Sequence, residues 1–181
     1  MPEKAAVLGF AYGFRLWKNA ERVTHVPGAS NEALIRVLFD RYFILWRSDL
    51  ILQQQLAYAV RMIAAFSSNT SHIVCEITEH HNKDQYLDTD EVAYRGVEFA
   101  HQNGYTVLYI LAAPTFPLLH RWFAVKKTRE FAAPYNIQVE ALKTGWIPSD
   151  PSSAQWWTRS FYANWWYTAT RVILHTHHRG E

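Results

Sequence analysis

The side chains best suited to bind or react with a ligand lie close together in one stretch, Asp150-Pro-Ser-Ser-Ala-Gln-Trp-Trp-Thr-Arg-Ser160. Pro151 with Ser152 predicts a helix start, because hydroxyl groups there accept bonds from the first unpaired helical N–H groups. Such a turn attracts anions, and Arg159 could add a fork of donors for a carboxylate or a phosphate. The alternative is a heavily capped helix in which Arg159 pairs with Asp150, and the motif taken alone favours that interpretation.

A second polar group, Ser30-Asn31-Glu32, stands at an expected helix start after Pro27-Gly28. In a ligand cleft, Asn31 could serve as an orienting donor and Glu32 as a carboxylate base. The same residues could equally form an ordinary helix cap with an acid that suits the helix dipole. Both interpretations stay open on the sequence.

A third group follows the most apolar segment of the chain, where His120 and Arg121 lie in an expected helix start. His120 could act as an acid or a base near neutral pH, and Arg121 could pair with an anion. They could instead lie on the outer face of that helix. Gly9 begins the loop Gly9-Phe-Ala-Tyr-Gly13, which forms either a plain turn or a close approach to a ligand, although it does not match the dinucleotide fingerprint.

Two sets of potential metal ligands are expected to bind none. Glu79-His80-His81 and Asp84 share one polar loop, and adjacent histidines seldom converge on one ion. Cys75 is the only cysteine, and its apolar surroundings predict a buried, inert thiol. The residues indicate no particular cofactor.

Composition bounds the class of protein. The 181 residues, 49% hydrophobic and 15% aromatic, suit one folded domain over residues 1–181. A net charge of +2 is too small to give the strong positive electrostatic potential that attracts nucleic acid, so no nucleic-acid partner is expected. The longest apolar run, Val107 to Leu119, is too short to span a bilayer, and the first residues lack the layout of a signal peptide. We therefore expect a cytoplasmic protein without a membrane partner.

Short apolar runs alternate with segments of helical period, which predicts a three-layer Rossmann-like α/β domain with a mainly parallel sheet of about five strands. The expected strands are Lys4–Phe10, His72–Ile77, Thr106–Ala112 and Ile137–Leu142, with a short buried run at Phe43–Trp46. The expected helices are Asn31–Tyr42, Asp49–Phe66, Asp88 to Gly104, Pro117–Ala132 and Ser152–Leu174, while residues 14–27 are expected to be irregular.

Ligands of such folds bind beyond the carboxyl ends of the strands. Several polar residues that are distant in sequence should therefore meet at that edge of the sheet, provided that the turn at Asp150 reaches it. They are Asn31, Glu32, Asp88, Thr89, Thr115 and Arg159.

With these residues in hand, the chain resembles the family of unknown function that contains YdcF, SanA and ElyC, most closely its soluble YdcF-like branch. The matching positions are Val7-Leu8-Gly9, Ser30-Asn31-Glu32, Gln53 to Gln55, Tyr86-Leu87-Asp88-Thr89, Leu111-Ala112-Ala113-Pro114, Ile147-Pro148, Asp150, Ser152, Gln155, Trp157, Thr158, Arg159 and Ser160. The resemblance implies a polar cleft at the strand ends and a phosphorylated or nucleotide-like small-molecule ligand, acted on by a transferase or hydrolase. From the residues of this chain we expect catalysis by Glu32 and His120 in such a cleft. We expect the ligand to be bound by Gly9, Asn31, Asp88, Thr89, Thr115, Arg121, Asp150, Ser152, Gln155 and Arg159.

Two departures from the family pattern favour an alternative function. The family commonly shows His-x-x-Arg at positions that correspond here to Phe116 and Leu119, whereas His120-Arg121 come a turn later. A glutamate expected near Thr168 is also missing. The alternative is a non-catalytic binding or scaffold protein, whose protein partner would contact exposed tryptophans among Trp146, Trp156 and Trp166.

Overall fold

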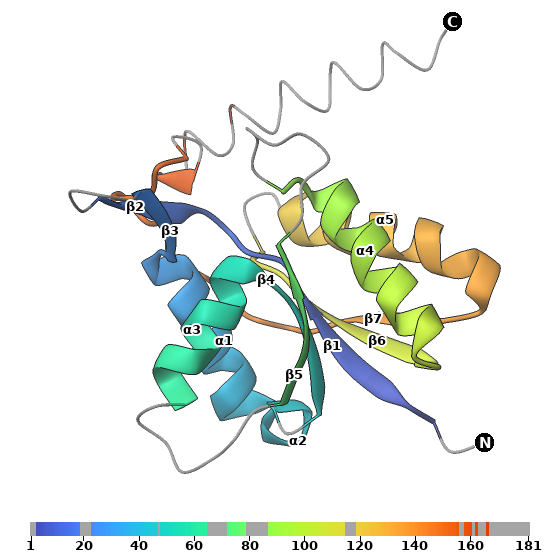
Figure 1. The fold of residues 1–181 in the computed structure, drawn as a ribbon. Coiled ribbons are helices and arrows are strands. Elements are labelled where there is room, and N and C mark those ends of the chain that lie inside the picture. Colours follow the sequence, from blue (N-terminus) through green and yellow to red (C-terminus); the bar gives the residue numbers. More distant parts are fainter. Residues whose placement is uncertain are drawn as a thin grey trace, which may run out of the picture.

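The computed structural model describes residues 3–18, 23–46, 48–64, 72–78, 87–114, 119–155, 158–160, 162 and 166. Five parallel strands form one sheet in the order β5-β4-β1-β6-β7 (Figure 1). Their bounds are β1 Ala5–Gly9, β4 Asp49–Gln53, β5 His72–Ile77, β6 Val107–Leu111 and β7 Gln138–Ala141. The expected three-layer α/β fold is confirmed.

Helices cover both faces of this sheet (Figure 1). Helices α1 (Ala29–Arg41) and α3 (Gln54–Ala64) pack on one face, and α4 (Thr89–Gln102) and α5 (Leu119–Ala132) pack on the other. The central strand β1 serves both cores, because successive side chains of a strand point to opposite faces. Leu8 belongs to the core under α4 and α5, whereas Val7 belongs to the core under α1 and α3. The chain turns into a short 3-10 helix, η1 (Ala133–Tyr135), before β7.

The expectation that residues 14–27 are irregular is wrong. They contain an antiparallel pair, β2 (Phe14–Lys18) and β3 (Val23–Pro27), with Phe14 opposite Pro27. Val23, Thr24 and Val26 are β-branched and favour this extended conformation, but interspersed charges hide the alternation that would have revealed it. The pair lies beside the start of α1, beyond the carboxyl end of β1 (Figure 1).

The single helix expected over residues 49–66 is also wrong in its first part. Residues Asp49–Gln53 form β4, and the helix α3 begins only at Gln54. A parallel strand with neighbours on both sides and helices on both faces is apolar throughout, so its sequence lacks the period of two. The run Phe43–Trp46, expected to be buried, is a short helix, α2, in which Ile44 is 86% exposed.

The start of α4 agrees with the sequence. Asp88 precedes the helix in an extended conformation, and its Oδ1 accepts a hydrogen bond from Glu91 N at 2.8 Å. Gly104 follows the end of α4 with a φ of 71°, a left-handed conformation that glycine adopts without strain. No helix in the described ranges is long and apolar enough to cross a membrane.

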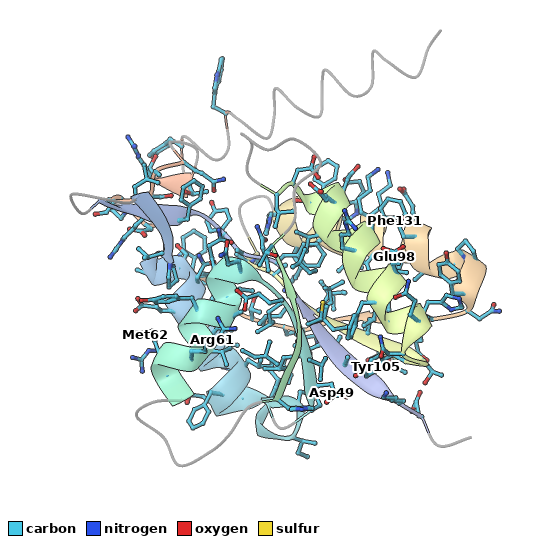
Figure 2. The ribbon with its side chains drawn as sticks, in the orientation of Figure 1. Asp49, Arg61, Met62, Glu98, Tyr105 and Phe131 are labelled. Atoms are coloured by element: carbon cyan, nitrogen blue, oxygen red, sulfur yellow. The ribbon has the colours of Figure 1, made fainter. Side chains whose placement is uncertain are left out.

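A cluster of polar side chains holds the opposite, amino edge of the sheet together, where Asp49 and Tyr105 lie close to each other (Figure 2). Asp49 Oδ2 accepts a bond from the Tyr105 hydroxyl at 2.5 Å, and its Oδ1 lies 2.7 Å from Nδ1 of His72. Burial acts to raise the pKa of Asp49, but the two hydrogen bonds outweigh it and lower the pKa. The cluster joins the beginnings of three strands and lies away from the expected ligand edge.

Candidate functional site

The order of the strands reverses at β1, because β4 and β5 lie on one side of it and β6 and β7 on the other. In open α/β sheets a ligand binds beyond the carboxyl ends of the strands at this reversal. The residues that follow β1 there are Phe10, Ala11, Tyr12 and Gly13, which we call the β1 loop. All four are buried.

Two buried amide side chains fix the path of the β1 loop. Asn31, at the start of α1, accepts a hydrogen bond from Tyr12 N at 2.7 Å through Oδ1 and donates through Nδ2 to Gly13 O at 2.6 Å. Gln53, at the end of β4, accepts from Ala11 N at 2.8 Å through Oε1. These bonds satisfy backbone groups that would otherwise be buried without partners. The predicted site residue Asn31 therefore lies at this edge and holds the loop in place.

Asp150 also lies at the carboxyl edge, with a side chain only 1% exposed. Its carboxylate accepts from both Nε and the terminal amino group of Arg15 at 2.9 Å, and from the backbone N–H groups of Ala29 and Ser152 at 3.1 Å. A Cβ at Gly28 would overlap Oδ2 of Asp150, so this close approach needs a glycine. The hydrogen bonds to Asp150 raise the pKa of Arg15.

The chain reaches Asp150 by running alongside α1, from the end of that helix to its start. The Tyr42 hydroxyl, just beyond α1, accepts from Lys143 N at 2.9 Å. At the other end of the helix, the Ser30 hydroxyl donates to Pro148 O at 2.7 Å. This course carries the polar stretch that begins at Asp150 from the end of β7 to the β1 loop.

The expected helix start at Ser152 is wrong. Ser153 N donates to Asp150 O in a turn, and Ala154 N donates to Phe14 O at 2.6 Å, so these residues pair with β2 instead of continuing a helix. Thr158 Oγ1 lies 2.6 Å from Ser153 Oγ, which in turn donates to Phe14 O. Gly13 has a φ of 75°, and a Cβ there would crowd both of these hydroxyl groups.

Among the described residues, Arg159 and Glu32 form no hydrogen bond or ion pair with each other. Arg159 is exposed, and its Nε donates to Ser153 O at 2.6 Å rather than to Asp150. Glu32 is exposed on α1, and its charge acts on Arg15. The pairing of Asp150 with an arginine that the sequence suggests does exist, but the arginine is Arg15.

His120 lies in the first turn of α5, with its ring centroid 5.4 Å from that of Tyr12 in the β1 loop. Burial lowers the pKa of His120 to about 4, against the opposing effect of a hydrogen bond to the backbone of Ala113. The imidazole is therefore neutral at pH 7. Arg121 beside it is half-buried, and its terminal amino group is 3.5 Å from Leu142 O, which is a weak contact.

Among the remaining predicted residues, Gly9, Asp88 and Thr89 lie at a strand end or a helix start. Gly9 ends β1, and a Cβ there would meet the side chains of Leu52 and Leu56, so packing accounts for this glycine. Asp88 and Thr89 begin α4. Gln155 is buried near Ser153, to which its backbone N–H donates at 3.2 Å. Thr115 lies outside the described residues, as do residues 79–86 with the two adjacent histidines.

Three residues that shape this edge were not predicted as part of the site. Arg15 lies in the segment expected to be irregular, and Gln53 lies near the start of the segment expected to be one helix. Ser153 was expected only as part of a helix start. A glutamine directly after an apolar run, as at Gln53, is the sequence signal that could have indicated the end of a strand at a polar site.

Replacing Asp150 with alanine should destabilise the fold by about 3 kcal/mol, near the lower end for a broken buried ion pair because Arg15 is partly exposed. Urea unfolding would measure this loss. Asp40→Ala removes an exposed acid from α1 and should change stability by less than about 0.5 kcal/mol. Equal effects of the two substitutions would contradict the role given to Asp150.

The low pKa of His120 predicts a pH dependence of stability. Between its ordinary value of 6.5 and about 4, the unfolded chain binds a proton that the folded chain does not. The free energy of unfolding should therefore fall as pH decreases through this window, by at most about 3 kcal/mol. The fall should be smaller in His120→Gln. Titration of the His120 ring by NMR gives the direct measurement, and a midpoint near 6.5 would exclude this effect.

Comparison with family models, with curated proteins and with solved structures finds no match for this chain. Its fold and the contacts at the carboxyl edge therefore carry the functional proposal.

Proposed function

We propose that this protein binds a phosphorylated or nucleotide-like small molecule at the carboxyl edge of the sheet, as a YdcF-like protein acting as a transferase or hydrolase. The observation that carries the proposal is the polar framework around the β1 loop at the reversal of strand order. Asn31 and Gln53 hold this loop from two elements, and the turn at Asp150 packs on its far end. A prepared polar edge at this point of an α/β sheet is where such folds bind ligands.

In this proposal the predicted residues divide into two groups. Asp150 and Asn31 are positioning residues, because their polar atoms already bond to the protein. Arg159 is exposed and would clamp the anionic group of the ligand. His120 beside Tyr12 would contact the ligand as a neutral imidazole, and Glu32 would supply a carboxylate base.

A second candidate is protein binding without catalysis. Its support is the exposure of two of the three tryptophans proposed for a partner, since Trp146 is 66% and Trp166 is 61% exposed. Trp156 lies outside the described residues. Large aromatic side chains contribute strongly to protein interfaces. A chain that binds no small molecule but loses self-association or partner binding in Trp146→Ala would favour this candidate.

Thermal shift with nucleoside monophosphates, sugar nucleotides and S-adenosylmethionine tests the first proposal. A ligand at 100 times its Kd should stabilise the protein by about 2.7 kcal/mol, and Arg159→Ala should remove most of that shift for phosphorylated ligands. Arg129→Ala is the matched control, because Arg129 is also exposed and donates to a backbone carbonyl, but near the far end of α5. A shift that both variants retain would exclude Arg159 as the clamp, and the absence of any shift would remove the proposal.

A further inference from the structure

One amide nitrogen at the carboxyl edge is buried without a hydrogen bond. Gln53 is 2% exposed, and its Nε2 has no partner in the described structure. A buried donor without a partner destabilises the folded chain, so such groups are rare and call for a partner.

The orientation of this amide is fixed by its other end. Oε1 of Gln53 accepts the hydrogen bond from Ala11 N at 2.8 Å, and only an oxygen can accept there. Nε2 is therefore the donor, and the amide head lies against the β1 loop. Two further buried glutamines have unpaired polar atoms in the described structure, Oε1 of Gln55 and Nε2 of Gln155. Gln55 lies in the first turn of α3, and Gln155 is in the segment that packs on Gly13 and Phe14.

Each arginine of this edge contacts a protein acceptor other than the Gln53 head group, and among the three only Arg15 is paired with a carboxylate of the described chain. Arg15 bonds to Asp150, Arg159 to Ser153 O, and Arg121 contacts Leu142 O. The hydrogen bond of the Gln53 head group is made with the backbone of the β1 loop, which is neutral. A phosphate buried against Gln53 would lose its hydration without gaining a cation, whereas a neutral carbonyl or hydroxyl group would lose far less.

We infer that Gln53 Nε2 donates a hydrogen bond to a neutral polar part of the ligand, either a nucleobase or a sugar, while the phosphate stays at the exposed Arg159. The inference rests on the proposed function. It adds that the neutral and the anionic parts of the ligand bind at two different subsites. Nucleobases and sugars both carry groups that accept a hydrogen bond, so they share the chemistry that this donor requires.

The test uses the full chain and neutral probes that carry no phosphate. Adenosine, uridine and glucose are titrated by calorimetry and compared with inorganic phosphate. The Gln53→Glu substitution keeps an acceptor for Ala11 N but removes the Nε2 donor, so a nucleoside or sugar that binds the wild type should bind at least tenfold more weakly. Gln54→Glu makes the same chemical change at the neighbouring exposed position and should leave binding unchanged.

A measurement on the wild type keeps the test valid if Gln53→Glu fails to fold. The side-chain amide NMR signals of Gln53 should shift when the neutral probe is added, while those of Gln54 stay in place. Binding of nucleosides but not of glucose assigns the subsite to the base, and the reverse assigns it to the sugar.

Two results would overturn the inference. Nucleotides could bind with the Gln53 signals unmoved and with Gln53→Glu equal to the wild type, in which case the proposed function survives without this subsite. Alternatively, neither nucleotides nor neutral probes could bind the wild type. Both proposals would then fail, and the Gln53 donor would be satisfied by buried water alone.

Discussion

The hydrogen bonds of one buried carboxylate, Asp150, determine how the carboxyl edge of this protein is built. Its two oxygens bring together the β2–β3 pair through Arg15, the start of α1 through Ala29, and its own turn through Ser152. A charged group this deeply buried is tolerated only with several donors of good geometry. Because the bonds involve segments far apart in the sequence, they also fix where the chain after β7 returns to the sheet.

The β1 loop depends on this arrangement. Asn31 of α1 and Gln53 of β4 form side-chain hydrogen bonds with its backbone, and Ser153 and Thr158 pack against its end. The edge thus combines buried, neutral amide side chains with an exposed cation, Arg159. In the proposed function, this combination suits a ligand that has one neutral and one anionic end. Preorganised groups of this kind bind ligands without first paying the entropy of ordering themselves.

The fold class could be predicted from the sequence because alternation of apolar runs and helical segments depends on local periodicity alone. Four of the five strands and the capping of α4 by Asp88 follow from such patterns. The strand β4 could not be separated from α3, since a strand buried on both faces shows no alternation and here merges with an amphipathic helix. The turn after Asp150 was mistaken for a helix start, because Ser153 and Ala154 bond to Phe14 O, more than a hundred residues away.

The site was predictable only in part, for the same physical reason. Asn31 and Asp150 could be recognised as polar residues at expected turns, but that Asp150 reaches the carboxyl edge depends on the path of the chain after β7, which the sequence does not show. Their partners could not be recognised, because the pairing of Asp150 with Arg15 requires the antiparallel pair β2–β3. Residue types in a local motif indicate which groups can form hydrogen bonds. Contacts with residues far away in the sequence determine which of these groups remain available to a ligand.

Hydrogen exchange with and without a saturating nucleotide tests most directly whether the carboxyl edge is the ligand site. The amides of Ala11 and Tyr12, which bond to Gln53 and Asn31, and those of residues 150–155 should exchange more slowly in the complex. The amino edge around Asp49 and Tyr105 should be unaffected. Protection confined to the amino edge or to the region of Trp146, with the β1 loop unchanged, would contradict the proposed site.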